Sequence, residues 1–377
     1  MLIDRTILKE IQKSLNKAKT VTILYGPRQA GKTTILNEIA NTLDKETIKQ
    51  YDGGDLYAQE VFGRPELSML KKTIGNAKYI FIDEAQKIPN IGLTLKLIVD
   101  HSQTKTIVSG SASFDLADKL NEPLTGRTDT LWLYPLSYGE IKNLFQQTSN
   151  AALFDNLLRF GMFPKIHQLN SDDEKQKYLT EYVNTYLYND LLTIGNIKKP
   201  KKVIDLLSLL ALQIGQEVSV SGLSCNLGLS HQTVDNYLDV LEKMFVIYNV
   251  RGLSRNLRKE INKTSKYYFL DLGLRNAIIR NFNQLSLRSD TGQMFENWFV
   301  MERIKFISNS QKFANFYFWR TYDQKEIDLV EERDGKMLGF ECKWSETKKI
   351  KKPSEWLKTY QNSAFVAINR ENFTEYL

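Results

Sequence analysis

The sequence predicts an α/β protein whose first part is a parallel sheet covered by helices on both faces. Three observations lead to this fold class. Short apolar runs alternate with helical patterns through residues 20–134, a glycine-containing loop follows the first run, and two acidic residues end a later one. Alternation of strands and helices is typical of parallel sheets. Ligands of such sheets bind at the carboxyl edge, where the loop and the acids would both lie.

The elements follow from the patterns in order. Apolar residues up to Leu15 recur at helical spacing, which predicts an amphipathic N-terminal helix. The apolar runs predict strands at Val21–Tyr25, Thr47–Tyr51, Tyr79–Asp83, Thr106–Ser109 and Thr130–Tyr134. Helices are expected from Lys32 onward and near Ile91–Asp100.

The loop after the first strand has the spacing G-x-x-x-x-G-K-T. It comprises Gly26, Pro27, Arg28, Gln29, Ala30, Gly31, Lys32, Thr33 and Thr34. Glycines let such a loop fold tightly, so that backbone N–H groups point inward and hold phosphates. Lys32 would reach the β- and γ-phosphates, and the Thr33 hydroxyl would sit on Mg²⁺. The alternative is a chance glycine turn, but the flanking strand, helix and second motif favour a nucleoside triphosphate site.

The second motif is the pair Asp83-Glu84 at the end of a four-residue apolar run. Asp83 is expected to hold Mg²⁺, and Glu84 to orient or deprotonate the attacking water. A surface Asp-Glu turn is the alternative interpretation, although a site that only binds nucleotide would not need the second acid.

Two further residues are candidates for the same reaction. Ser111 follows the fourth strand and would place a hydroxyl near the γ-phosphate, unless Ser109-Gly110-Ser111 is a plain turn before a helix over Ser113–Leu120. Arg127 precedes the fifth strand and is a candidate arginine finger, which would stabilise charge in the transition state. The alternative is a surface arginine.

Composition bounds the class of protein. A chain of 377 residues is expected to hold two or three domains. No apolar run approaches the roughly 18 residues of a membrane span, and no signal-peptide pattern is present, so no membrane partner is expected. Cys225 and Cys342 lie far apart within apolar segments, which predicts buried thiols in a reducing cytoplasm.

Residues 146–199 turn helical, and residues 200–270 then read as a winged helix. The expected elements are helices at Val218–Leu227 and Gln232–Phe245, followed by strands at Val246–Val250 and Tyr267–Leu270. The would-be recognition helix carries acidic residues that suit a DNA groove poorly: Asp235, Asp239 and Glu242. Nucleic acid contact would therefore come from the wing, or the domain would serve only as a protein scaffold.

The chain's net charge of +7 is concentrated at that wing. Residues 251–270 hold one acidic residue and six basic ones: Arg251, Arg255, Arg258, Lys259, Lys263 and Lys266. A local basic segment indicates an anionic partner such as DNA, bound here through residues 251–266. A solvated loop is the competing interpretation.

The C-terminal residues 271–377 predict a helix at Gln293–Phe306 and strands that place polar groups together. Alternation along the strands puts Glu341 and Lys343 on one face, with Asp328 on the neighbouring strand. Glu296 on the preceding helix could add a further carboxylate. Asp328, Glu341 and Glu296 would hold Mg²⁺ or Mn²⁺, and Lys343 would offset charge during phosphodiester cleavage. Polar faces of a half-exposed sheet are the alternative.

The whole chain resembles prokaryotic ATPases that fuse an AAA-type P-loop domain to a C-terminal domain of unknown function, itself a winged helix plus a restriction-endonuclease-like module. The motifs that carry the resemblance are GPRQAGKTT (26–34), YIFIDEAQKIP (79–89), VSGSASFDL (108–116), LTGR (124–127), YPLSYGEI (134–141), KYYFLDLGLRN (266–276), GQMFENW (292–298), EIDLV (326–330) and FECKW (340–344). One departure is FGMFP (160–164), where two adjacent glycines would be usual.

The resemblance implies ATP rather than GTP, and the expected domains are ATP-binding (1–145), helical lid (146–199), winged helix (200–270) and nuclease-like (271–377). The resemblance does not settle function, but the motifs and the basic segment lead us to expect an Mg²⁺-dependent ATPase that engages DNA and could cleave it. The alternative is a nucleotide-dependent switch or scaffold for a protein partner, with an inactive nuclease-like module. An arginine finger acting in trans would require a homo-oligomer, whereas one acting in cis would not.

Overall fold

The computed structural model describes residues 3–111, 124–145, 150–189, 191, 199–254, 264–321, 325–345 and 353–377. The chain divides into two compact units, Met1–Leu136 with Lys243–Phe245 and Ser137–Glu242 with Val246–Leu377. Several predictions lie outside the described residues: the helix over Ser113–Leu120 and the basic residues Arg255, Arg258, Lys259 and Lys263.

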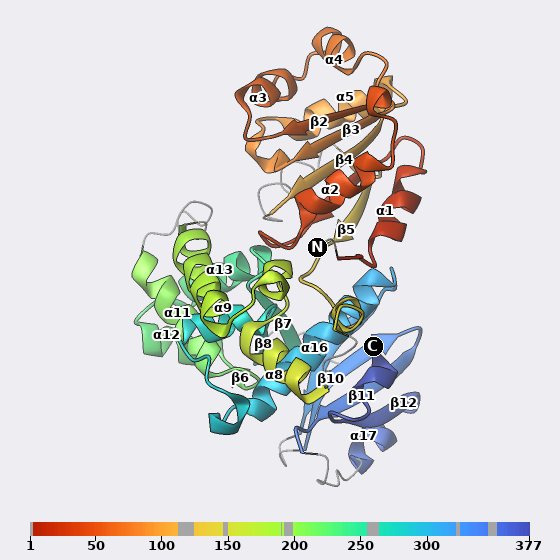
Figure 1. The fold of residues 1–377 in the computed structure, drawn as a ribbon. Helices are drawn as coiled ribbons and strands as arrows, with labels where there is room; N and C mark the ends of the chain where they lie inside the picture. The colour runs from red at the N-terminus through yellow and green to blue at the C-terminus, as the bar shows by residue number, and fades with distance from the viewer. Residues whose placement is uncertain are drawn as a thin grey trace. The chain divides into compact units, whose positions relative to one another are not determined.

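The first unit is built on a five-stranded sheet in the order β2-β3-β4-β1-β5 (Figure 1). Every neighbouring pair is parallel, which confirms the expected α/β core. The strands are β1 (Val21–Tyr25), β2 (Ile48–Asp52), β3 (Tyr79–Asp83), β4 (Lys105–Gly110) and β5 (Thr128–Trp132). Strands β1 and β4 are almost wholly buried, as continuous apolar runs in parallel sheets require.

Helices cover this sheet. They are α1 (Leu8–Leu15), α2 (Lys32–Asn41), α3 (Leu56–Gly63), α4 (Leu67–Ile74) and α5 (Ile91–His101), with single turns η1 (Lys45–Thr47) and η2 (Ala85–Lys87). Apolar residues of α1 and α2, including Ile11 and Ile35, share one core cluster with Leu24 of β1 and Phe81 of β3. Helices α3 and α4 were not expected from the sequence, because both are only eight residues long and their apolar patterns are short.

The second unit contains helices and short helical turns along its whole length. They are α7 (Tyr138–Lys142), α8 (Asn150–Phe160), η3 (Pro164–Gln168), α9 (Asp172–Glu181), η4 (Tyr182–Leu187), α11 (Pro200–Leu212), α12 (Val220–Leu227), α13 (His231–Lys243), α15 (Leu272–Ile278), η5 (Leu285–Leu287), α16 (Thr291–Asn309), α17 (Ser354–Thr359) and η6 (Phe373–Tyr376). Capping boxes at Ser137 and Ser171 fix the starts of α7 and α9.

One seven-stranded sheet runs through this unit in the order β12-β11-β10-β9-β7-β8-β6 (Figure 1). Its strands are β6 (Glu217–Val218), β7 (Ile247–Gly252), β8 (Ser265–Phe269), β9 (Asn315–Arg320), β10 (Glu326–Arg333), β11 (Lys336–Cys342) and β12 (Ser363–Ile368). The expected wing strands are β7 and β8, and β7 also pairs in parallel with β9 at Arg251↔Tyr317 and Gly252↔Phe318. The helical region, the hairpin and the C-terminal strands therefore belong to one unit.

A tight junction between α8 and α15 explains two of the sequence motifs. Gly161 has φ +77, and a Cβ atom there would lie 2.0 Å from Asp271 Oδ1. Asp271 in turn accepts hydrogen bonds from the Met162 amide at 2.6 Å and the Leu274 amide at 3.1 Å, the latter capping α15. Only glycine suits position 161, whereas the next residue has room for its methionine side chain.

The two cysteines differ in their environment. Cys342 is buried, but Cys225 is exposed. The prediction of two buried thiols is therefore wrong for Cys225. The inward-facing positions of α12 are Leu223, Ser224 and Leu227, and Cys225 lies outside that face.

Candidate functional site

The glycine-containing loop connects β1 to α2 at the carboxyl edge of the first sheet. A Cβ atom on Gly26 would lie 2.1 Å from the Leu133 carbonyl oxygen, so glycine is required where the loop leaves the strand. Gly31 has φ +101 and Gln29 has φ +61, and α2 begins at the next residue, Lys32. The backbone thus takes the left-handed conformations that let successive N–H groups face a common point.

Arg5, which the sequence analysis did not single out, braces this loop. Its guanidinium donates to the Ala30 carbonyl oxygen at 2.7 Å and to the Tyr134 carbonyl oxygen at 2.7 Å. The side chain is buried, so both bonds are shielded from water. An arginine directly before an amphipathic helix carries no sequence signal for this role.

Lys32 is buried in the loop, with 5% of its surface exposed. Its ammonium donates to the carbonyl oxygens of Gly26 at 2.8 Å and Pro27 at 2.9 Å. Burial lowers the pKa of Lys32 to about 8, and the nearby carboxylates of Glu84 and Asp83 oppose that shift. The ammonium therefore remains largely protonated at neutral pH and needs a stronger anionic partner than two carbonyl groups.

Asp83 lies where three polar groups converge. Thr33 Oγ1 donates to Asp83 Oδ2, and Ser109 Oγ donates to Asp83 Oδ1. The Glu84 amide also donates to Asp83 Oδ1, at 3.0 Å. The loop threonine and the strand-end aspartate thus meet at one point, as the two motifs predict. Ser109 was treated only as part of a turn, and its position at the end of β4 is the signal that could have identified it.

Glu84 stands in a strained conformation beside that point. Its φ is +49, which is uncommon for a residue with a Cβ atom and is found preferentially at functional sites. Gln86 Nε2 donates to Glu84 Oε2 at 2.6 Å and to Ser111 Oγ at 3.1 Å, and Ser111 Oγ lies 3.4 Å from the same carboxylate oxygen. The structure therefore brings Ser111 to Glu84, and it adds Gln86, which the sequence analysis missed.

The remaining loop residues complete the cradle. Pro27 and Ala30 are buried, Arg28 is half-buried, and Gln29, Thr33 and Thr34 are exposed. An exposed threonine hydroxyl beside Asp83 leaves room for a ligand at the edge of the sheet.

Arg127 lies at the other edge of the sheet. It precedes β5, whose first residue Thr128 pairs with Val21, the first residue of β1. The loop leaves β1 after Tyr25, about 13 Å further along a five-residue strand. Arg127 Nε instead contacts Asp100 Oδ1 at 3.0 Å. The arrangement contradicts a role for Arg127 at its own chain's nucleotide.

A second polar cluster lies in the other unit, around the Lys266 ammonium. Lys266 Nζ contacts Glu296 Oε1 at 3.0 Å, Glu326 Oε1 at 2.5 Å and Asp328 Oδ1 at 3.2 Å. Burial alone would lower the pKa of Lys266, but the surrounding acidic groups raise it well above its ordinary value. Lys266 was expected at a DNA surface, and that prediction is wrong, because its side chain is only 1% exposed.

Of the predicted nuclease residues, Glu296 and Asp328 contact this ammonium, and Glu341 and Lys343 pair with each other. Asp328 Oδ2 accepts from the Cys342 amide at 2.8 Å, and Lys343 Nζ donates to Glu341 Oε1 at 2.7 Å. Burial and repulsion from Asp328 raise the pKa of Glu341. Among the described residues, which include Glu296, Asp328 and Glu341, no three acidic, histidine or cysteine side chains are grouped to hold a metal ion. Lysines engage these carboxylates: Lys266 contacts Glu296 and Asp328, and Lys343 contacts Glu341.

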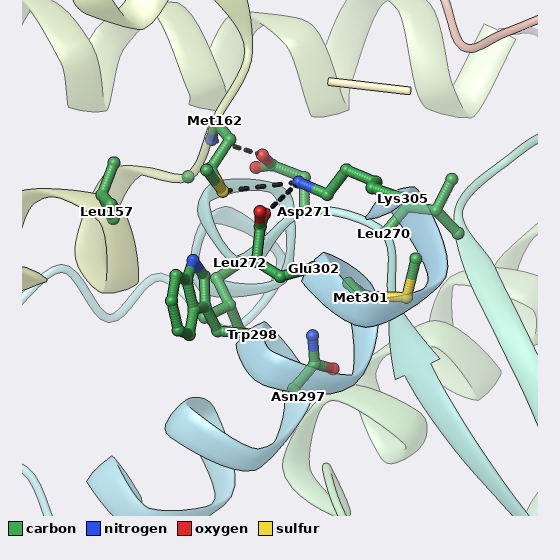
Figure 2. A pocket seen from close by; sticks show the side chains of 11 residues that line it. Leu157, Met162, Leu270, Asp271, Leu272, Asn297, Trp298, Met301, Glu302 and Lys305 are labelled. Atoms are coloured by element: carbon green, nitrogen blue, oxygen red, sulfur yellow. Dashed lines mark hydrogen bonds and ion pairs between the residues drawn. The ribbon is translucent and has the colours of Figure 1, made fainter. Parts of the chain in front are cut away.

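Figure 2 shows a small pocket beside α16, lined by Asp271, Glu302 and Lys305 among others. The Lys305 ammonium lies between Glu302, with which it forms an ion pair, and Met162, whose sulfur is 3.5 Å away. The cavity has a volume of only about 10 Å³. That space suits about one water molecule, so the pocket is no substrate site.

Comparison with known proteins divides the chain into three matched segments. Residues 18–142 match the AAA domain family. Residues 151–285 and 291–374 match two domains of unknown function, DUF8612 and DUF4143. The first of these matches runs across the predicted boundaries at 199 and 270. In the described part of the chain, no helix is both long and apolar enough to cross a membrane.

Relatives with similar sequences are uncharacterized. A protein of Mycobacterium tuberculosis is 28% identical over 355 residues, covering 93% of this chain and 76% of that protein. A protein of Methanocaldococcus jannaschii is 26% identical over 332 residues, covering 83% and 72%.

Solved structures show only weak similarity. AMPPCP-bound DnaA from Aquifex aeolicus has 16% identity and a TM-score of 0.31, covering 62% of this chain and 86% of DnaA. A Pif1 helicase solved for DNA unwinding at forked duplexes has 14% identity and a TM-score of 0.27. That match covers 48% of this chain and about half, 52%, of the helicase. Residues 18–142 are thus similar to the AAA domain family and form a parallel sheet with a glycine-containing loop, and two segments similar to domains of unknown function follow.

Proposed function

We propose that the chain is an Mg²⁺-dependent ATPase that uses the first unit's loop and strand-end acids. The observation that carries the proposal is the convergence of Thr33, Ser109 and the Glu84 amide on the Asp83 carboxylate. Oxygen donors from a P-loop threonine and a strand-end aspartate are the set that Mg²⁺ prefers beside nucleotide phosphates. Thr33 and Asp83 would hold the ion, which when bound neutralises charge on the phosphate oxygens.

The chain's own residues divide the remaining work. Lys32 exchanges its two carbonyl partners for the β- and γ-phosphates, which are stronger acceptors. Backbone N–H groups within residues 26–34, other than Pro27, which has none, bind phosphate oxygens at the start of α2. Glu84 orients the attacking water and accepts its proton, while Ser111 and Gln86 hold the carboxylate in position.

Two substitutions separate binding from turnover. Lys32→Ala should abolish ATP binding, because the loop loses its only buried cation among the described residues 26–34. Glu84→Gln should keep ATP affinity within about threefold yet slow hydrolysis at least 100-fold, as loss of a general base does. Binding of a fluorescent ATP analogue and release of phosphate measure the two steps. Unchanged turnover in Glu84→Gln would remove Glu84 from its proposed role.

We further propose that nucleotide state controls engagement of DNA by the second unit. The support is the concentration of basic residues within 251–263, which leaves out the buried Lys266, and among these residues Arg251 is exposed in β7. Helices α11, α12 and α13 followed by the β7–β8 hairpin agree with the order of a winged helix. The acidic helix α13 makes the hairpin side the more suitable surface for phosphates.

The alternative function is a nucleotide-dependent switch for a protein partner, with a C-terminal module that does not cleave. One observation favours a module that does not cleave: Lys266, which is not among the predicted nuclease residues, engages the carboxylates of Glu296 and Asp328. DNA binding without cleavage agrees with both the basic segment and this cluster, and it is the form of the proposal that we adopt.

A further inference from the structure

The cluster around Lys266 brings together side chains from three elements. Lys266 extends from β8, Glu296 from α16, and Glu326 and Asp328 from β10. Strands β8 and β10 are not neighbours, since β7 and β9 lie between them in the sheet. The Lys266 ammonium lies 5.9 Å from the centroid of the Phe318 ring of β9. A long side chain is needed to carry the ammonium from β8 to the acids.

The ammonium at the centre is shielded from water. Its side chain is 1% exposed, and those of Asp328 and Glu296 are 7% and 12% exposed. Carboxylates this deeply buried require a cation, because an unpaired buried charge costs several kcal/mol. In metal-dependent enzymes a divalent ion supplies that charge. In this chain a lysine supplies it.

The distances fit an ammonium. Its contacts of 2.5 to 3.2 Å with the three acids are hydrogen-bond lengths. Other bonds fix the acids in this arrangement. The Tyr268 hydroxyl donates to Glu296 Oε1 at 2.7 Å, and the Cys342 amide donates to Asp328 Oδ2 at 2.8 Å.

We propose that Lys266 is a built-in cation that takes the place of a divalent metal in the C-terminal module, so that this module keeps its carboxylates ordered without binding Mg²⁺ or Mn²⁺. The module then holds its partner without cleaving it. This inference does not depend on ATP hydrolysis by the other unit, because the two sites share no residue.

The test counts Mn²⁺ ions bound to the full-length chain by electron paramagnetic resonance, without nucleotide. All variants carry Asp83→Asn, which removes the aspartate at the phosphate loop. With Lys266 intact, adding Asp328→Asn should leave the number of bound ions unchanged. Lys266→Met should add one bound Mn²⁺ per chain, because three acids then surround a vacated position, and Asp328→Asn should remove it again.

Lys343→Met is the matched control. It deletes a lysine of the same cluster that pairs with Glu341 and leaves the Lys266 contacts in place, so it should add no Mn²⁺. Circular dichroism establishes that each variant is folded. Two results would overturn the proposal: Asp328-dependent Mn²⁺ binding while Lys266 is present, or no added ion in a folded Lys266→Met protein. The first comparison decides the matter even if Lys266→Met does not fold.

Discussion

At the scale of single residues, backbone geometry separates positions that the sequence makes look alike. Gly161 and Gly335 have nearly the same φ, +77 and +72. A Cβ atom on Gly161 would meet Asp271 Oδ1 at 2.0 Å and both other carboxyl atoms at 2.5 Å, whereas one on Gly335 would meet nothing within 4 Å. Both positions therefore favour glycine because of their backbone conformation, but only Gly161 also lacks space for a Cβ atom.

Alanine substitutions at these glycines should differ accordingly. Gly335→Ala should lower the free energy of unfolding by about 1–2 kcal/mol, the cost of a left-handed conformation with a Cβ atom. Gly161→Ala should lower it by about 3–5 kcal/mol, because overpacking against Asp271 is added. Urea denaturation followed by circular dichroism measures both changes. Equal losses would show that the α8–α15 junction can shift to accept the Cβ atom without a further loss in the free energy of unfolding.

Residue types near the nucleotide could be predicted, but their partners could not. The spacing of Lys32, Thr33 and Asp83 follows from a motif whose geometry is local to one loop and one strand end. Arg5 contacts Ala30, which is far away in the chain. Gln86 contacts Glu84, whose backbone has the unusual φ of +49. No periodicity or spacing encodes such contacts.

At the scale of elements, α16 shows how charged residues can occupy a buried helix. Three ion pairs involve this helix: Glu302 with Lys305, Arg303 with Glu331, and Glu296 with Lys266. Glu302 Oε2 also accepts from the Tyr138 amide at 2.7 Å. Because the side chains of Glu302 and Lys305 are both only 2% exposed, each charge depends on the other.

Removal of one partner of this pair should be costly. Lys305→Met should lower the free energy of unfolding by about 3–5 kcal/mol at neutral pH, since Glu302 keeps an uncompensated charge. The double variant Glu302→Gln/Lys305→Met should recover a large part of that loss. A double-mutant cycle by urea denaturation gives the coupling energy. A coupling near zero would mean that the pair does not stabilise the helix.

The pH dependence of the same variant has a defined sign. Burial already raises the pKa of Glu302 in the folded protein, and loss of Lys305 removes the interaction that opposes this shift. The folded state therefore binds a proton more readily than the unfolded state, whose glutamate pKa is about 4.3. The deficit of Lys305→Met should be small near pH 4 and should grow as the pH rises toward neutrality. A deficit independent of pH would point to lost packing instead.

The bounds of the buried strands could be predicted from the apolar runs, but the contacts of individual side chains could not. Strands β1 and β3 begin and end at the predicted residues because their apolar runs match the buried length of a parallel sheet. The sequence placed Lys266 in a basic segment, and only the pairing of β8 with β7 and the position of α16 turn it toward acids. Pairing of β7 with β9 joins residues 66 positions apart, which no local pattern reports.

At the scale of the whole molecule, the position of Arg127 bears on assembly. It stands at the amino edge of a sheet whose carboxyl edge carries the phosphate loop, so an arginine finger could act only on a neighbouring chain's nucleotide. A half-buried arginine paired with Asp100 on the same chain is the alternative interpretation.

Mixing two inactive variants distinguishes these roles. Arg127→Ala keeps its own nucleotide site, and Lys32→Ala keeps its arginine. If Arg127 acts in trans, each variant alone should have at least about tenfold less ATPase activity than the wild type, and an equimolar mixture should regain part of it. Specific activity of the wild type should also rise with protein concentration. Full activity of Arg127→Ala alone would exclude the finger and leave a surface ion pair.

The most direct test of the whole account is the affinity for DNA as a function of nucleotide state. Glu84→Gln holds ATP without turnover, so fluorescence anisotropy with a labelled duplex can compare its ATP, ADP and nucleotide-free states. We expect different affinities in these states, and each affinity should fall as salt rises because phosphate contacts release counterions. Arg251→Ala should weaken binding and reduce the salt dependence, whereas Lys336→Ala, at the exposed first residue of β11, should not. Equal affinity in all nucleotide states, or no binding at low salt, would contradict coupling to DNA.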